Sequence, residues 1–193
     1  MGGAQGEYLI YTPVERALGS GRWDMPVWHY SVKEVDEERT AKAMSWDQPV
    51  SLKEAYEIMK IIRGMRLNDA IDFLKKVIRK EVPVPYVRYK RKVAHKRGLA
   101  KAFPKWKTPI GRYPVKTAKA ILKLLENVRN NAENKNLDVD SLVIIHIAAH
   151  KGPVLKRYMP RAFGRATPKF GTTVHMEVIV KEVLSKKEGG ARR

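Results

Sequence analysis

Residues 151–171 read KGPVLKRYMPRAFGRATPKFG, and this stretch decides the fold. It separates two segments rich in valine and isoleucine, residues 142–150 and 172–183, and both segments read as strands. A compact β-hairpin needs a loop of only about two to five residues, whereas the connection here has 21. We therefore predict that the two strands continue outward as a long hairpin arm, residues 148–173. At about 3.3 Å per residue, the arm reaches roughly 40 Å to a tip near Arg161.

The composition of the arm indicates what orders it. The arm carries six lysines and arginines and no acidic residue. Two strands alone cannot bury their own surface, and an isolated hairpin is marginally stable in water. We therefore expect an anionic partner to order the arm.

The charge of the whole chain is concentrated in two windows. The 193 residues include 39 Lys and Arg against 20 Asp and Glu, a formal net charge of +19. Residues 82–125 hold thirteen basic residues and residues 141–176 hold six, and neither window holds an acidic residue. The remainder of the chain is charge-balanced. Such a distribution is the pattern expected of two surfaces that face nucleic acid on one scaffold.

The first window begins with a long segment, residues 82–113, which we call the basic loop. It contains four prolines, five aromatic residues and ten lysines or arginines, and it shows neither a helical nor a strand period. A segment of this length without regular structure is usually functional or disordered. Arginine forms bidentate hydrogen bonds with phosphate and stacks on bases, and aromatic rings stack on unpaired bases. The composition therefore favours contact with RNA.

We predict that both windows bind RNA. A run of charge is often only a solvated face, but the lack of acids and the interleaved aromatic residues favour nucleic-acid contact. The predicted RNA-binding residues of the basic loop and the helix after it are Arg88, Lys90, Arg91, Lys92, His95, Lys96, Arg97, Lys105, Trp106, Lys107, Arg112, Lys116 and Lys119. Those of the arm are Lys156, Arg157, Arg161, Arg165 and Lys169.

Three helices are predicted between the charged segments. Ser51 and Glu54 have the spacing of a capping box, so a first helix begins there, and Gly64 ends it. Asn68 is the predicted N-cap of a second helix, which stops before Pro83. A third helix follows Pro114. Its apolar stripe consists of Ala118, Ile121, Leu122, Leu125, Val128 and Ala132.

A first strand is predicted at residues 27–33, where apolar and polar residues alternate. The predicted fold class is α+β, with three helices packed on a small antiparallel sheet and a long protruding β-hairpin arm. We expect a single RNA-binding domain over residues 25–183. Residues 1–24 are then an N-terminal extension of unknown role, and residues 184–193 are a C-terminal tail.

Candidate chemical sites are few. The chain has no cysteine, which excludes disulfides, thiolate zinc sites and cysteine nucleophiles. His146 and His150 share a strand face, and if the hairpin closes near residue 160, His175 faces His146. Polar sheet-edge residues or RNA contacts are nevertheless the better interpretation than a metal site. Residues 36–38, Asp-Glu-Glu, could mimic the carboxylates of a nuclease, but neighbouring residues do not converge on one point. We predict neither a catalytic residue, a metal nor a cofactor.

The sequence offers no targeting signal in the segments it contains. No apolar run approaches the roughly 18 residues of a membrane helix. The first six residues lack the basic start and the apolar stretch of a signal peptide. We therefore expect a cytoplasmic protein without a membrane partner.

The arm sequence, residues 152–166, closely resembles the arm signature of the L-twenty-two family of large-subunit ribosomal proteins. Residues 62–64 (Ile-Arg-Gly), 131–133 (Asn-Ala-Glu) and 137–142 (Leu-Asp-Val-Asp-Ser-Leu) are similar to that family as well. The resemblance spans about residues 27–183. The length of the basic loop resembles the archaeal and eukaryotic branch rather than the shorter bacterial form.

This resemblance implies a structural constituent of the large ribosomal subunit in the cytoplasm. The implied partners are large-subunit ribosomal RNA, neighbouring ribosomal proteins and the nascent chain, with no small-molecule substrate and no enzymatic activity. Members of the family aid subunit assembly and thread their hairpin through RNA to the peptide exit tunnel. Carried over to this sequence, Lys156, Arg157, Met159, Arg161 and Arg165 lie at or near the tip. The tunnel-lining residues are then Arg157, Met159 and Arg161.

Two alternatives belong to other classes. A basic DNA-architectural protein would wrap duplex with repeated, evenly spaced arginines in the minor groove, whereas this chain has one long arm. A nuclease would need converging carboxylates. The residues alone support binding to structured nucleic acid, and the resemblance specifies the ribosome.

Overall fold

The structure, a computed structural model, describes residues 29–32 and 35–183. The predicted extension and tail, residues 1–24 and 184–193, lie outside the described residues. In chain order the elements are β1 (Thr40–Gln48), α1 (Leu52–Ile62), α2 (Leu67–Ile78), β2 (Val84–Pro85), α3 (Leu99–Ala102), β3 (Gly111–Arg112), α4 (Val115–Asn134), the 3-10 turn η1 (Val139–Ser141), β4 (Leu142–Leu155), β5 (Tyr158–Pro160), the 3-10 turn η2 (Ala162–Gly164), β6 (Ala166–Pro168) and β7 (Gly171–Glu182).

The main sheet has three antiparallel strands in the order β1-β7-β4. The register of β1 on β7 runs from Thr40 opposite Lys181 to Gln48 opposite Val174. On its other side, β7 pairs with β4 from Leu142 opposite Glu182 to Leu155 opposite Gly171. The last strand of the chain is therefore the centre of the sheet, and β1 and β4 are its edges.

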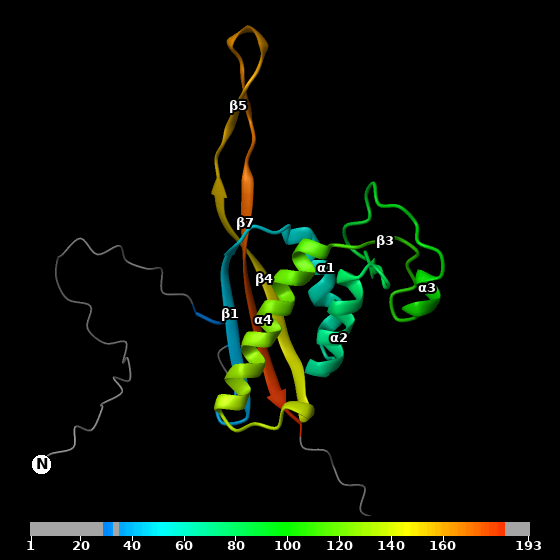
Figure 1. Cartoon of the computed structure of the whole chain (residues 1–193), viewed down its shortest axis with the longest axis vertical. Helices are drawn as coiled ribbons and strands as arrows, with labels where there is room; N and C mark the ends of the chain where they lie inside the picture. Colours follow the sequence, from blue (N-terminus) through cyan, green and yellow to red (C-terminus); the bar gives the residue numbers. More distant parts are fainter. Residues whose placement is uncertain (1–28, 33–34, 184–193) are drawn as a thin grey trace, which may run out of the picture.

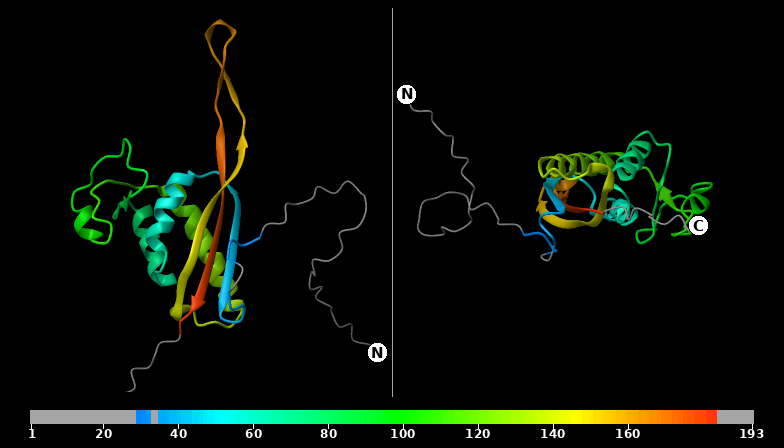
Figure 2. Two further views of the ribbon diagram at one scale, coloured as in Figure 1. Left: turned by 180° about the vertical axis from the view of Figure 1, so that it is seen from behind. Right: turned by 90° about the horizontal axis from the view of Figure 1, so that it is seen from below.

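Helices α1, α2 and α4 cover one face of this sheet, as the front and back views show (Figures 1 and 2). Along β7, alternate side chains point to that face and are fully buried in the hydrophobic core, as the period of two in a strand requires. The helices contribute the other half of the core through residues at helical spacing. The largest fully buried side chains are Ile58, Ile62, Leu67, Leu74, Leu99, Ile121, Leu124, Leu125, Leu142, Ile144, Ile147 and Met176.

The arm is confirmed as a continuation of the two long strands. Beyond the end of the β4–β7 pairing, β5 and β6 continue the ladder as far as Pro160 opposite Ala166, and η2 closes the hairpin. Every residue from Leu155 to Thr172 is exposed, because neither helix nor third strand packs on this part (Figure 1). Three prolines, Pro153, Pro160 and Pro168, lie within its strands.

The first strand was predicted at the wrong position, residues 27–33. Its described part, residues 29–32, is not a strand, and residues 27, 28 and 33 lie outside the described residues. Within residues 29–32 and 35–183 the first strand is β1, which the sequence pattern missed. Its inward-facing residues Ala41 and Ala43 are small and almost fully buried. Alanine is depleted in strands and gives a weak alternation signal, so the burial here follows from packing against α4 and not from residue type.

Helix boundaries were predicted well, but the caps were not. Ser51 precedes α1 in an extended conformation, yet its side chain makes no capping hydrogen bond, and Glu54 accepts from the Thr117 hydroxyl at 2.9 Å instead. Gly64, with φ of 84°, ends that segment as predicted. Helix α2 starts after Arg66, so Asn68 lies inside the helix and donates to Asp140 at 2.9 Å. The side chains of Glu54 and Asn68 therefore bond to tertiary partners rather than to free backbone amides.

Helix α4 matches the predicted apolar stripe with one exchange. Leu122 is only half-buried, whereas Leu124, which was not predicted, is 2% exposed. Leu124 faces the core because the helix is covered from two directions, by the sheet and by α2. Among the described residues, no helix combines the length and the apolar character that a membrane crossing requires.

Candidate nucleic-acid interface

A single buried carboxylate anchors the basic loop to the helical layer. Glu57 of α1 is fully buried, and it accepts hydrogen bonds from three consecutive backbone N–H groups, those of Val87 (2.9 Å), Arg88 (2.8 Å) and Tyr89 (2.7 Å). Hydrogen bonds to an ionised acceptor are about twice as strong as neutral ones. The start of the loop is thus fixed by a residue about thirty positions earlier in the chain.

The rest of the loop is folded against the hydrophobic core, to which it contributes Val84 and Tyr86, so the prediction of a segment without regular structure is wrong. Strands β2 and β3 pair, and the short helix α3 places Leu99 in the interior, where it is 2% exposed. Gly111 lies so close that a Cβ atom there would come within 2.6 Å of the Leu99 side chain and 2.7 Å of the Val84 carbonyl oxygen. Only glycine allows this approach. The interior rests on isolated residues, which carry no periodic signal.

Aromatic rings of the loop lie beside its cations. The Arg88 guanidinium lies 5.3 Å from the ring centroid of Tyr56 and 5.6 Å from that of Tyr89. The Lys96 ammonium lies 5.2 Å from the ring of Tyr113. Cation–π contacts of this kind hold a charged group at the surface without neutralising it. The predicted interleaving of aromatic and basic residues therefore corresponds to direct contacts.

Most predicted RNA-binding residues are exposed, and within the described part of the chain none of the predicted lysines and arginines forms an ion pair. Lys96 and Trp106 are half-buried. Arg88, Lys90, Arg91 and Arg112 surround one shallow cavity together with Tyr89. The remaining exposed members of the first window are Lys92, His95, Arg97, Lys105, Lys107, Lys116 and Lys119.

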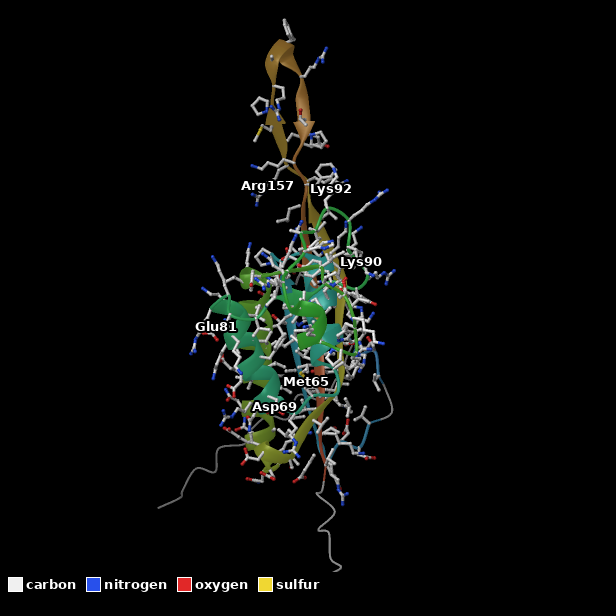
Figure 3. All side chains as sticks on the ribbon, turned by 90° about the vertical axis from the view of Figure 1, so that its right-hand side faces the viewer. Met65, Asp69, Glu81, Lys90, Lys92 and Arg157 are labelled. Atoms are coloured by element: carbon white, nitrogen blue, oxygen red, sulfur yellow. The ribbon has the colours of Figure 1, made fainter. Side chains whose placement is uncertain are left out.

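Basic and acidic residues are distributed unevenly along the long axis of the molecule (Figure 3). Lys90 and Lys92 lie toward the arm end of the body, while Glu81 and Asp69 lie farther from the arm (Figure 3). Arg157 extends the basic side chains onto the arm itself (Figure 3). Basic side chains therefore continue from the arm end of the body onto the arm, although Glu54 lines the same cavity as Arg88 and Asp47 accepts from Thr173 at the base of the arm.

The arm residues divide into a shaft and a tip. Lys156 and Arg157 lie between β4 and β5, and the Lys169 N–H donates to the Arg157 carbonyl oxygen across the hairpin at 2.6 Å. Arg161 and Arg165 flank the closing turn, where the Arg161 N–H donates to the Arg165 carbonyl oxygen at 2.8 Å. Of the three predicted tunnel-lining residues, only Arg161 lies at the turn. Arg157 lies on the shaft and Met159 lies in β5.

Sequence reasoning missed the residue that forms the tip. Phe163 is 96% exposed and has a φ of 58°, a backbone conformation that residues other than glycine rarely adopt. It places an exposed aromatic ring in the closing turn, between Arg161 and Arg165 in the chain. Farther down, Tyr158 and Phe170 make an edge-to-face contact across the hairpin at 5.8 Å.

The histidines share one sheet face, as predicted, but in a different register. The hairpin closes at residues 162–164, so His175 lies opposite His150 rather than opposite His146. A carboxylate, which the sequence reasoning had not placed there, joins them. Glu177 is 1% exposed on the sheet face away from the helices, and its Oε1 lies 2.9 Å from His146 Nε2 and 3.3 Å from His150 Nε2. In the described residues, no group of three potential ligands could hold a metal ion.

The protonation of this cluster is shifted. Burial raises the pKa of Glu177, but hydrogen bonds from Ser31, His146 and His150 outweigh burial and leave the pKa of the carboxyl below its ordinary value. The pKa of the neighbouring Tyr30 is raised by burial and by the Glu177 charge. Glu177 is therefore an ionised, buried acceptor that holds residues 30–31 against the sheet.

The acidic segment near residue 37 does not form a nuclease site. The Asp36 carboxylate accepts from Lys181 at 2.6 Å, and this hydrogen bond lowers the pKa of Asp36. Glu37 pairs instead with Lys42, with 3.5 Å between the charged atoms. The two carboxylates neutralise separate lysines and do not converge.

Comparisons with known proteins agree with this architecture. The profile of the family "Ribosomal protein L22p/L17e" matches residues 43–181. The large ribosomal subunit protein uL22 of Staphylothermus marinus is 59% identical over 159 residues, covering 82% of this chain and 99% of the relative. The uL22 protein of Ignicoccus hospitalis is 60% identical over 161 residues, with the same coverage. That of Methanopyrus kandleri is 51% identical over 157 residues, covering 80% of this chain and 96% of the relative.

These matches define the class first: the protein is a structural ribosomal protein and not an enzyme. The chain belongs to the ribosomal protein L22p/L17e family, in its archaeal form. The predicted resemblance and the predicted α+β fold with its arm are thereby confirmed.

Proposed function

We propose that this protein binds large-subunit ribosomal RNA through two separate surfaces and so helps to assemble and hold the large ribosomal subunit in the cytoplasm. One surface is the basic loop with the first turns of α4, and the other is the arm. The observation that carries this proposal is that both surfaces consist of exposed cations without ion pairs, whereas the acidic residues elsewhere in the described chain include several that pair with lysine or arginine. Unpaired cations are the groups that displace counterions from phosphates.

The shape of the arm supports threading into folded RNA. A two-stranded ribbon with every side chain exposed is narrow, and it can enter spaces that the helical body cannot. Its aromatic residues Tyr158, Phe163 and Phe170 can stack on unpaired bases, which is how sequence is commonly read in RNA. The relatives are named as large-subunit proteins, which points to the same RNA as the partner.

We further propose that the tip of the arm reaches the nascent-peptide exit tunnel. Arg161, Arg165 and Phe163 surround the closing turn, so they are the residues that extend farthest from the body. Met159 and Arg157 lie behind them and would line the tunnel wall only if the arm enters it obliquely. Neighbouring ribosomal proteins and the passing nascent chain are the further partners.

Sedimentation tests the main proposal. A tagged full-length chain expressed in an archaeal host should migrate with the large subunit in a sucrose gradient and stay there in moderate salt. A variant with Lys156, Arg157, Arg161 and Arg165 replaced by alanine should shift to the top of the gradient. If the unaltered chain stays at the top or follows the small subunit, the proposal is wrong.

A further inference from the structure

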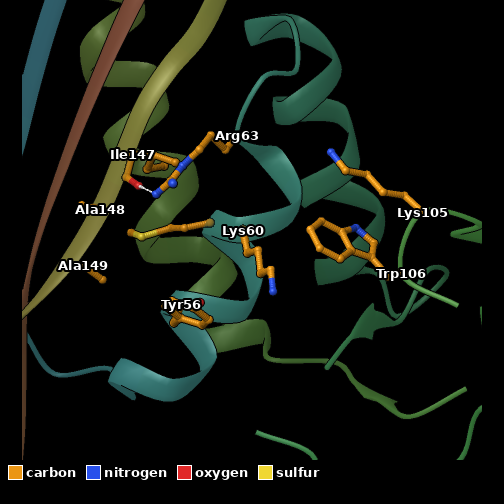
Figure 4. A pocket seen from close by; sticks show the side chains of 9 residues that line it. Tyr56, Lys60, Arg63, Lys105, Trp106, Ile147, Ala148 and Ala149 are labelled. Carbon is orange, nitrogen blue, oxygen red and sulfur yellow. Dashed lines mark hydrogen bonds between the residues drawn. The ribbon is translucent and has the colours of Figure 1, made fainter. Parts of the chain in front are cut away.

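An open groove on the helical body brings two residues of the basic loop beside α1 and β4. Its floor is one face of α1, formed by Tyr56, Met59, Lys60 and Arg63. One wall is the outer edge of β4 at residues 147–149, and the other is Trp106 of the basic loop (Figure 4). The cavity has a volume of about 440 Å³, which lies within the usual range for sites that hold one small molecule.

The charge of the groove has one sign. Lys60, Arg63 and Lys105 contribute three cations, none of the nine lining residues is acidic, and in the described part of the chain none of the three forms an ion pair. Arg63 donates one hydrogen bond, from Nη2 to the Ile147 carbonyl oxygen at 2.7 Å (Figure 4). Because a guanidinium carries five N–H donors, Arg63 is positioned by this bond and can still bind an anion.

The ring of Trp106 is a platform beside these cations. The Lys60 ammonium lies 4.8 Å and the Lys105 ammonium 5.2 Å from its centroid. Lysine is flexible, so each ammonium can leave the ring for a phosphate while a base takes its place on the ring. A flat apolar surface next to unpaired cations fits a ligand that has an aromatic plane and a negative charge a few ångströms away, which describes a nucleotide.

We propose that this groove binds one unpaired nucleotide of an RNA chain, with its base on Trp106 and its phosphate between Lys60, Arg63 and Lys105. The inference rests on the RNA binding proposed above and adds a base-level site on the helical body. A duplex is too wide for a groove of this volume, so the nucleotide is one that bulges or turns out of a helix. Tyr56, Lys60 and Arg63 belong to α1, a helix without any predicted RNA contact.

The test is chemical probing of a large-subunit ribosomal RNA transcript bound by the full-length chain. We expect one unpaired nucleotide to be protected by the unaltered protein and to become reactive with Trp106→Ala, while the protections made by the arm remain. Trp106→Phe keeps an aromatic face and should keep most of the protection. Because stacking contributes one to a few kcal/mol per base, the affinity of the Trp106→Ala variant should fall roughly 5- to 100-fold.

Two further variants guard against a trivial result. Trp46→Ala removes a half-exposed tryptophan of β1, outside the groove, and should leave that nucleotide protected. Lys60→Ala combined with Lys105→Ala leaves the ring in place and should also expose the nucleotide, which separates loss of the site from unfolding of the loop.

Three results would overturn the proposal, and they are distinguishable. If the unaltered protein protects no part of the RNA, the RNA-binding function itself fails and the groove fails with it. If the RNA is protected but Trp106→Ala changes no single nucleotide, only the groove assignment is wrong. If a ten-residue oligoglutamate probe binds and is lost with Lys60→Ala but not with Trp106→Ala, the groove is a site for an acidic peptide instead.

Discussion

The basic loop and the arm have the same charge pattern but opposite structural support. Both are rich in lysine, arginine and aromatic residues and lack acids. The loop nevertheless contributes buried residues to the hydrophobic core and is tied to α1 by Glu57. The arm from Leu155 to Thr172 buries nothing. Charge composition therefore predicts what a segment binds, while the buried contacts decide whether it is folded before it binds.

Hydrogen exchange on the free protein should show the largest difference between the two regions. The amides of Val87, Arg88 and Tyr89 bond to a buried carboxylate, so they should exchange roughly a hundredfold more slowly than the arm amides of residues 156–170. Mass spectrometry with amide-level resolution measures this difference. Equal protection in both regions would show that the arm has a stable structure of its own and would remove the contrast.

The next largest effect is expected from removing the anchor. Glu57→Ala leaves three backbone amides without their acceptor and should cost about 3 kcal/mol in the free energy of unfolding. Glu57→Gln keeps the shape and one acceptor and should cost less. Arg161→Ala at the arm tip is the matched surface change and should stay within about 0.5 kcal/mol. Urea unfolding distinguishes them, and a Glu57→Ala variant as stable as Arg161→Ala would mean that the loop does not depend on the anchor.

A pH titration sharpens the comparison at the base of the arm, where the sheet is still ordered. The pKa of Glu177 is lower in the folded protein than its ordinary value, so its stabilisation is present at neutral pH and is lost as the pH falls through the lowered pKa. Glu177→Gln should therefore cost about 1–3 kcal/mol at neutral pH, and the cost should shrink in acid. Thermal unfolding of both proteins across this pH range measures the difference. A cost that stays constant down to strongly acidic pH would contradict the shift.

A smaller effect is expected in the salt dependence of RNA binding. Replacing Arg91, Lys92, Lys96 and Arg97 with glutamine should reduce the slope of log affinity against log salt by about 3, since each phosphate contact releases about 0.7–0.9 counterions. Replacing Lys156 and Lys169 on the shaft should reduce it by about 1.5 for the same reason. Filter binding at several salt concentrations gives both slopes. An unchanged slope for the loop variant would make the loop a solvated face.

The smallest effect on assembly is expected at the tip. Arg161→Ala with Arg165→Ala should leave incorporation into the subunit nearly intact while altering the passage of nascent chains or the action of drugs that bind the tunnel. The shaft pair Lys156→Ala and Lys169→Ala should reduce incorporation more. Gradient profiles and a translation assay compare the two variants. If the tip variant loses as much incorporation into the subunit as the shaft variant does, the tip and the shaft do not have different roles.

The sequence predicted the parts of the fold that have strong periodic patterns. The apolar stripe of α4 and the valine- and isoleucine-rich strands β4 and β7 were identified because each repeats a burial signal several times. Strand β1 was missed since its buried residues are small. The predicted capping box at Ser51 does not form because Glu54 bonds to Thr117, and Asn68 is not an N-cap because its side chain bonds to Asp140. The histidine register was wrong because the tip lies at Phe163 rather than near residue 160.

The candidate site was predicted as a list of cations but not as an assembly. Glu57 was the key omission, and the helical period gives no signal for its burial. Glu57 falls on the polar side of α1 together with Lys53 and Lys60, where a glutamate is expected to be exposed. What covers it comes from thirty residues downstream, and no local pattern indicates that distance. The groove beside Trp106 depends in the same way on three segments that are far apart in the chain.

The prolines of the arm have a consequence for the protein before it joins a ribosome. An exposed hairpin has two bare edges, and rows of free backbone groups invite a second copy to add its own strands. Pro153, Pro160 and Pro168 lack the N–H group that such pairing needs, and they interrupt the rows along both strands. The lysines and arginines between them repel another arm of the same charge. Freshly synthesised copies are therefore expected to accumulate side by side without aggregating through their exposed arms.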